Sequence, residues 1–148
     1  MLTTSYTVLD SGILLATVLT ETHSDKAKAL VAHLLRANTQ LVAPALQHYE
    51  FFAVIRKWVH RNALAPGQAM RGLDTLLQYP VVLHLDEALL WRGYELAAEF
   101  NRPTSYDSQY LAVAERFQCD FWTVDERLYN AVNGRFPHIH WIGNWPEA

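Results

Sequence analysis

The chain has 148 residues, a hydrophobic fraction of 51% and a formal charge of −3. This length and apolar content predict one domain over residues 1–148 and argue against a disordered chain. The single cysteine, Cys119, excludes an internal disulfide framework and a thiolate zinc cluster. We expect a cytoplasmic protein with no membrane segment, because no secretory leader is recognisable and no apolar run approaches the roughly 18 residues that a membrane helix needs.

Strands and helices are predicted to alternate along the chain. In chain order we expect a strand at Tyr6–Asp10, helices at Ile13–Leu19 and from Ser24 to about Asn38, a strand at Gln40–Ala43, helices at Pro44–Arg61 and Pro66–Gln78, a strand at Val81–Leu85, helices at Glu87–Phe100 and Ser105–Gln118, a strand at Asp120–Thr123 and a fifth at Ile139–Ile142. The alternation predicts an α/β fold, a three-layer α/β/α sandwich around a central parallel sheet of four to five strands.

Four acidic residues lie near the ends of these elements. Asp10 ends the first strand, Asp125 comes just past the fourth, Glu50 lies about two turns into the helix after the second strand, and Asp107 lies in the first turn of the helix that leads to the fourth. Ligands of open α/β sheets bind outside the carboxyl ends of the strands, so all four acids can reach one edge. Carboxylate oxygens are the ligands of hard divalent cations, and the pattern therefore predicts a metal site.

The predicted helix faces favour this interpretation. Glu50 shares its face with Val54, and Asp107 shares its face with Tyr110 and Leu111, so both acids point towards packed surfaces. A carboxylate in such a place costs roughly several kcal/mol unless it is paired or bound to a metal ion.

Each acid also has an ordinary structural explanation. Asp10 and Asp125 could cap helices or form turns, Asp107 could be an early-turn acid favoured by the helix dipole, and Glu50 could pair with an arginine. The occurrence of all four at one sheet edge favours the metal site.

Four stretches carry a resemblance to a known family: Val8-Leu-Asp-Ser11, the helix start at Pro44–Glu50, Ser105–Ala114 and Thr123–Leu128. With these motifs in this order, the sequence resembles the PIN-domain ribonucleases and, in size, the VapC-type toxins of toxin–antitoxin pairs. The resemblance implies a metal-dependent endoribonuclease that hydrolyses phosphodiester bonds of single-stranded or structured RNA with Mg²⁺ or Mn²⁺. It also implies an antitoxin partner, as in a type II toxin–antitoxin pair, and favours a homodimer.

The resemblance assigns roles to individual residues. Asp10 takes the role of first metal ligand, Glu50 and Asp107 those of further acidic site residues, and Asp125 that of the more variable fourth acid. Thr123 would orient a ligand or a water molecule.

Two features depart from the family pattern. Gly12 stands where many relatives have a polar or β-branched residue. The long apolar run from Ile13 to Leu19 is a candidate for a dimer interface or a partner groove.

The charge and the remaining polar residues are less specific. Without the four acids the chain carries +1, which is compatible with RNA binding. Lys57 could reach a substrate phosphate, with Arg56 and Arg61 on neighbouring helix faces, but a solvated, charged helix end is the better explanation for each of the three. Three aromatic residues could stack on bases but are more simply explained as core residues: Trp58, Tyr106 and Trp122. Two histidines that would share one face of a strand, His138 and His140, give only a weak zinc signal.

Two other classes of function remain open. A non-catalytic PIN-like module that binds RNA or a protein would keep the fold and need no metal, but the four intact acids count against it. A phosphoacceptor signalling domain would also collect acids at a sheet edge, but it needs two neighbouring acids after the first strand, where only Asp10 stands.

Overall fold

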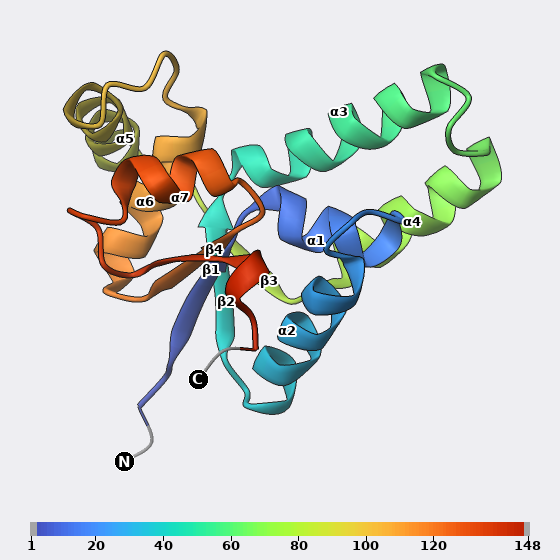
Figure 1. Ribbon diagram of the computed structural model, residues 1–148, viewed down its shortest axis with the longest axis horizontal. Coiled ribbons are helices and arrows are strands. Elements are labelled where there is room, and N and C mark those ends of the chain that lie inside the picture. The colour runs from blue at the N-terminus through green and yellow to red at the C-terminus, as the bar shows by residue number, and fades with distance from the viewer. Residues whose placement is uncertain (1–2, 147–148) are drawn as a thin grey trace.

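A five-stranded parallel sheet forms the centre of the molecule in the computed structural model, which describes residues 3–146 (Figure 1). The strands lie in the order β3-β2-β1-β4-β5 and are β1 (Tyr6–Leu9), β2 (Gln40–Pro44), β3 (Val81–His84), β4 (Asp120–Thr123) and β5 (Ile139–Trp141). Every neighbouring pair is parallel. The structure confirms the predicted parallel sheet and all five of its strands.

Helices cover both faces of this sheet, which confirms the three-layer fold. Residues of four helices share one hydrophobic cluster on one face: α1 (Ser11–Val18), α2 (Ser24–Arg36), α3 (Leu46–His60) and α4 (Pro66–Gln78). Residues of three others share the cluster on the opposite face: α5 (Glu87–Glu99), α6 (Tyr106–Phe117) and α7 (Glu126–Val132). Figure 1 shows α3 and α4 extending together from the body of the fold.

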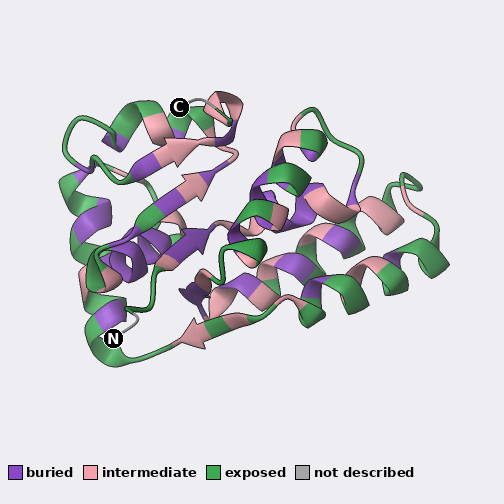
Figure 2. Cartoon of the chain, turned by 90° about the horizontal axis from the view of Figure 1, so that it is seen from below, coloured by how far each residue is buried: buried purple, intermediate pink, exposed green. Residues whose placement is uncertain are grey.

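The strands form this core because their side chains alternate between the two faces. Val8 and Phe121, neighbours on β1 and β4, are buried on the side of α5, α6 and α7. Leu9 and Leu41 are buried on the side of α1 to α4. The buried residues follow the sheet and the inner sides of the helices (Figure 2).

Several predicted boundaries differ by one or two residues, and one helix was missed. Pro44 does not begin a helix; it ends β2, where it pairs with His84 of β3, and α3 begins at Leu46. Proline has no N–H group to donate to a neighbouring strand, and here it stands at the very end of β2, where the ladder stops. The short helix α7 was not predicted, because its seven residues are too few to show a helical period.

The apolar run Ile13–Leu19 lies almost entirely inside the protein. Ile13, Leu14 and Leu19 are buried in the cluster that α1 shares with α2, α3 and α4. This run therefore forms core, and its assignment to a dimer interface or a partner groove was wrong.

The glycine in this region also has a structural reason. A Cβ atom on Gly12 would lie 2.5 Å from Cγ2 of Val124, so the close approach of the two segments requires a residue without a side chain. Of residues 3–146, no helix is long and apolar enough to cross a membrane.

Candidate functional site

Asp10 directly follows β1, where its backbone N–H donates to the carbonyl of Trp122 in β4 at 3.0 Å. Its side chain caps α1, because Oδ1 accepts from the N–H of Ile13 at 2.9 Å. The other oxygen, Oδ2, accepts from the Thr123 hydroxyl and from the N–H of Val124. Burial raises the pKa of Asp10 to about 7, although these hydrogen bonds act in the opposite direction.

Thr123, the last residue of β4, connects two of the acids. Its side chain is fully buried and its hydroxyl donates to Asp10. The same oxygen accepts the backbone N–H of Asp125 at 3.0 Å. One hydroxyl group thus fixes the position of Asp10 relative to the chain that carries Asp125, which is the geometry expected of a residue that orients its neighbours.

Glu50 is positioned by two contacts of its helix. Gln47, one turn earlier on α3, is buried and donates from Nε2 to the carbonyl of Leu9 at 2.8 Å, which holds α3 against the end of β1. The hydroxyl of Tyr110 on α6 donates to Glu50 Oε1 at 2.6 Å. Burial raises the pKa of Glu50, while hydrogen bonds from Tyr110 and Ser11 lower it. The ordinary explanation of Glu50 was an ion pair with an arginine, but its partner in the structure is the hydroxyl of Tyr110.

Asp107 and Asp125 lie in the first turn of α6 and at the start of α7. Asp125 caps α7, because its Oδ1 accepts from the N–H of Leu128 at 3.0 Å. Burial raises the pKa of Asp107, and the charge of Asp125 raises it further. The guanidinium of Arg102, 3.9 Å from Asp107 Oδ2, acts against both effects.

The four acids are therefore neighbours at the carboxyl ends of β1 and β4. Electrostatic repulsion couples them in a row, because Glu50 raises the pKa of Asp10, Asp107 raises that of Glu50, and Asp125 raises that of Asp107. Within residues 3–146, however, no three His, Cys, Asp or Glu side chains are close enough to hold a metal ion as they stand. The chemistry of the donors suits a hard cation, while their arrangement is more open than a finished coordination shell.

Sequence reasoning did not identify the supporting polar residues. Gln47 was given no role and Tyr110 was considered only as a packing neighbour of Asp107, although both hold the site together. The available signal was spacing, since Gln47 precedes Glu50 by three residues and Tyr110 follows Asp107 by three, which places each pair on one helix face.

The other residues considered from the sequence lie outside this group. The three basic residues near the end of α3 are exposed and form no ion pair within the described part of the chain: Arg56, Lys57 and Arg61. Trp58 packs against the hydrophobic cluster of α1 to α4. Trp122 stacks on His140, with ring centroids 4.7 Å apart. These two tryptophans have structural contacts, whereas Tyr106 is 65% exposed.

The two histidines near β5 form a separate polar contact. His140 Nε2 lies 2.9 Å from Asp120 Oδ1, and His138 Nδ1 lies 3.6 Å from the same oxygen. Within residues 3–146, neither Asp120 nor any other His, Cys, Asp or Glu joins them to form a group that could hold a metal ion.

The fold and the site together define a class of protein: a parallel α/β sandwich with acidic residues gathered at the carboxyl edge of its sheet. Comparison with known proteins leads to the same class. The family model for the PIN domain matches residues 7–133, which is most of the chain. The protein therefore belongs to the PIN domain family.

Similar proteins indicate which branch of the family the chain resembles. The chain is 28% identical over 135 residues to VapC ribonuclease Mb0985 of Mycobacterium bovis and to ribonuclease VapC9 of Mycobacterium tuberculosis, with 88% of this chain and 94% of each relative covered. Among solved structures, PAE2754 from Pyrobaculum aerophilum superimposes with a TM-score of 0.67 at 22% identity, covering 96% of this chain and 94% of that one. The resemblance to the VapC-type branch of the family is thus confirmed.

Proposed function

We propose that this protein is a metal-dependent endoribonuclease that hydrolyses phosphodiester bonds in single-stranded RNA. The observation that carries the proposal is the row of electrostatically coupled carboxylates at the carboxyl ends of β1 and β4. Relatives that are named ribonucleases, and that align over nearly the whole chain, support RNA as the substrate.

The donor set fits Mg²⁺ or Mn²⁺. The four proposed ligands, Asp10, Glu50, Asp107 and Asp125, offer only carboxylate oxygens, which such ions prefer. When bound, one or two of these ions would supply charge neutralisation at the phosphate and activation of a water molecule. Within residues 3–146 only Arg102 forms an ion pair with any of the four acids, so the protein itself offers little positive charge to balance these carboxylates.

The neighbouring side chains would serve this chemistry by positioning the carboxylates. Thr123 holds Asp10 by donating its hydroxyl hydrogen, and Tyr110 holds Glu50 in the same way. Each donated hydrogen bond favours the ionised form of its acid, which is the form that binds a cation. Asp10 and Asp125 are further fixed because each caps a helix.

The cellular setting belongs to the same proposal. By its likeness to VapC ribonucleases, the protein would be the toxin of a type II toxin–antitoxin pair, bound by an antitoxin protein. We further propose that it acts in the cytoplasm as a homodimer and that residues 1–148 form one nuclease domain. Light scattering of the purified protein would test the homodimer directly.

The experiment that tests the activity is cleavage of a labelled pool of single-stranded RNA. Wild type with Mg²⁺ or Mn²⁺ is expected to cut the pool, whereas wild type in chelator and the Asp10→Asn variant are not. Asp74→Asn, a change at an exposed acid of α4, serves as the matched control and should cut like wild type. Failure of wild type to cut RNA with either ion, in a sample that is folded by circular dichroism, would overturn the proposal. A non-catalytic module that only binds RNA or a protein would then be the better description.

A further inference from the structure

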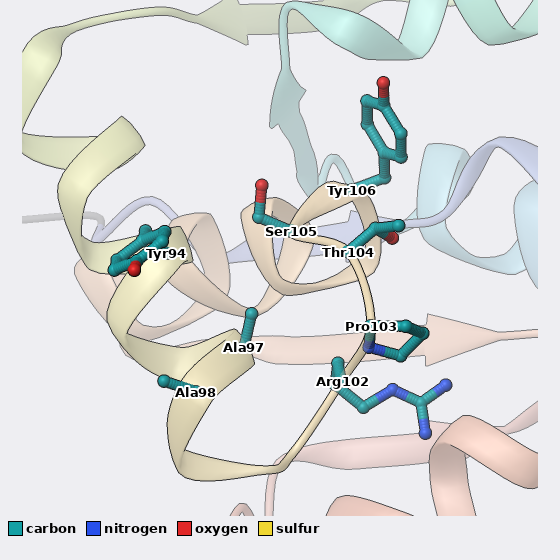
Figure 3. A pocket seen from close by; sticks show the side chains of 8 residues that line it. All are labelled: Tyr94, Ala97, Ala98, Arg102, Pro103, Thr104, Ser105 and Tyr106. Carbon is teal, nitrogen blue, oxygen red and sulfur yellow. The ribbon is translucent and has the colours of Figure 1, made fainter.

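An open hollow of about 520 Å³ lies between α5 and the segment that leads into α6 (Figure 3). Its walls are Tyr94, Ala97 and Ala98 from α5, and residues 102–106 of the chain that follows. The next residue is Asp107, so the hollow borders the row of acids.

The two walls are joined by short hydrogen bonds. The buried Ser108 hydroxyl donates to the carbonyl of Gly93 on α5 at 2.6 Å, which fastens α6 to α5. The backbone N–H of Arg102 donates to the carbonyl of Ala97 at 2.7 Å. Asn101 makes the turn after α5 in the left-handed conformation, with φ of 53°. The hollow is therefore a preformed part of the fold, and a ligand would pay little to order it.

Two exposed tyrosines stand on opposite sides of the hollow (Figure 3). Tyr94 is 64% exposed and belongs to α5, whereas Tyr106 is 65% exposed and begins α6. Large aromatic rings left in water next to an active site are suited to stacking with bases, because every base has a π-face.

Arg102 supplies the positive charge at the same place. Its side chain is 22% exposed, and its guanidinium lies 3.9 Å from Asp107. Its Nε is buried and finds no hydrogen-bond partner within the described residues. A ligand cannot reach the buried Nε, but the two terminal nitrogens of the guanidinium carry four N–H donors, and the one long ion pair to Asp107 leaves some of these for phosphate oxygens.

We propose that this hollow is a nucleotide subsite for the substrate strand. It would hold one nucleotide beside the bond to be cut, with its base against Tyr106 and Tyr94 and its phosphate on Arg102. The volume lies in the range of about 300–1,000 Å³ typical of sites for small organic ligands. The inference rests on RNA being the substrate, as proposed above, and it selects a single strand because a duplex hides the faces of its bases.

The test is binding of a short labelled single-stranded RNA, followed by fluorescence anisotropy, to protein that carries Asp10→Asn. This background separates the subsite from the activity, because binding is scored without cleavage. In it, Tyr106→Ala and Tyr94→Ala are each expected to raise the Kd at least about fivefold, since base stacking on an aromatic residue is worth about that factor or more. Tyr106→Phe keeps the ring and should stay within about twofold.

Arg102 has its own readout in the same assay. Arg102→Gln should lower the slope of log K against log salt by about 0.7, the value for one lost phosphate contact with a single strand. Met70→Ala, at a position of α4 that is 70% exposed, is the control and should leave both Kd and slope unchanged.

Two results would overturn the subsite. One is RNA binding by the Tyr106→Ala and Tyr94→Ala proteins as tight as that of their parent. The other is a parent protein that binds no single-stranded RNA at all. Absence of RNA cleavage by the wild-type protein would instead count against the nuclease proposal. The failure of the subsite and the failure of the nuclease proposal are therefore distinguishable.

Discussion

The raised pKa of Asp10 gives a quantitative prediction for its replacement by asparagine. In the folded protein this pKa is about 7, against 3.8 for an ordinary aspartate. Between these values the folded state binds more protons than the unfolded state, so the free energy of unfolding must fall as pH rises. A shift of about three units corresponds to roughly 4 kcal/mol at 1.36 kcal/mol per unit. Because Asp10 is only partly buried as a residue, we expect roughly 2–3 kcal/mol after solvent screening.

Asparagine removes this pH dependence but keeps part of the hydrogen bonding. Its carbonyl oxygen can still accept from Ile13 and cap α1, whereas its NH₂ group faces the donors on Thr123 and Val124. The lost acceptor costs about 1–3 kcal/mol. In chelator the Asp10→Asn protein should therefore be less stable than wild type near pH 4.5, and equal to it or more stable at pH 8.

Urea unfolding followed by tryptophan fluorescence, in chelator and at both pH values, measures this change. For the exposed-site control Asp74→Asn, the free energy of unfolding should change with pH in the same way as that of wild type. If the difference in free energy of unfolding between Asp10→Asn and wild type is the same at both pH values, the pKa of Asp10 is not raised and the reasoning fails.

Three further perturbations follow from the same structure. Millimolar Mg²⁺ at pH 8 should raise the Tm of wild type and leave the Asp10→Asn protein unchanged in a thermal-shift assay, since only an ion that binds the folded state stabilises it; equal shifts would contradict a site at Asp10. Tyr110→Phe should cost about 1–3 kcal/mol at pH 8 in urea unfolding and less near pH 4, because the lost hydrogen bond favours ionised Glu50; a loss independent of pH would refute this. Gly93→Ala should cost less than about 1 kcal/mol in urea unfolding, since its Cβ would meet only the far end of the Gln109 side chain, which can move at the expense of its long hydrogen bond to the Leu90 carbonyl; a loss of more than about 2 kcal/mol would show that Gln109 cannot move.

The sequence was sufficient for the sheet and for the meeting of the four acids. Buried strands have a short apolar signature, and the carboxyl ends of parallel strands must share an edge, so Asp10 and Asp125 could be brought together without coordinates. The capping of α1 and α7 by these two acids also agrees with the simpler explanation of their positions. The two explanations are compatible, because each cap uses Oδ1 alone: Oδ2 of Asp10 accepts from Thr123 and Val124 instead, and Oδ2 of Asp125 accepts no hydrogen bond within residues 3–146.

Other features depended on tertiary contacts that no local pattern reports. The pairing of Pro44 with His84 extends β2 past the expected boundary, since the sheet partner decides where a strand ends. The burial of Ile13–Leu19 depends on four helices packing on one face. Likewise, Gln47 looks like a surface residue until its helix is seen to end against β1.

The double duty of Asp10 and Asp125 bears on how such a protein can lose its activity during evolution. Substitution at either position removes a chemical group and also leaves the start of a helix uncapped, a defect worth about 1 kcal/mol. Within residues 3–146, Asp107 caps no helix and its one ion pair is the long contact with Arg102, so its loss should spare the fold. Inactive descendants of this protein should therefore retain Asp10 and Asp125, or replace them with other capping residues, and should vary first at Asp107.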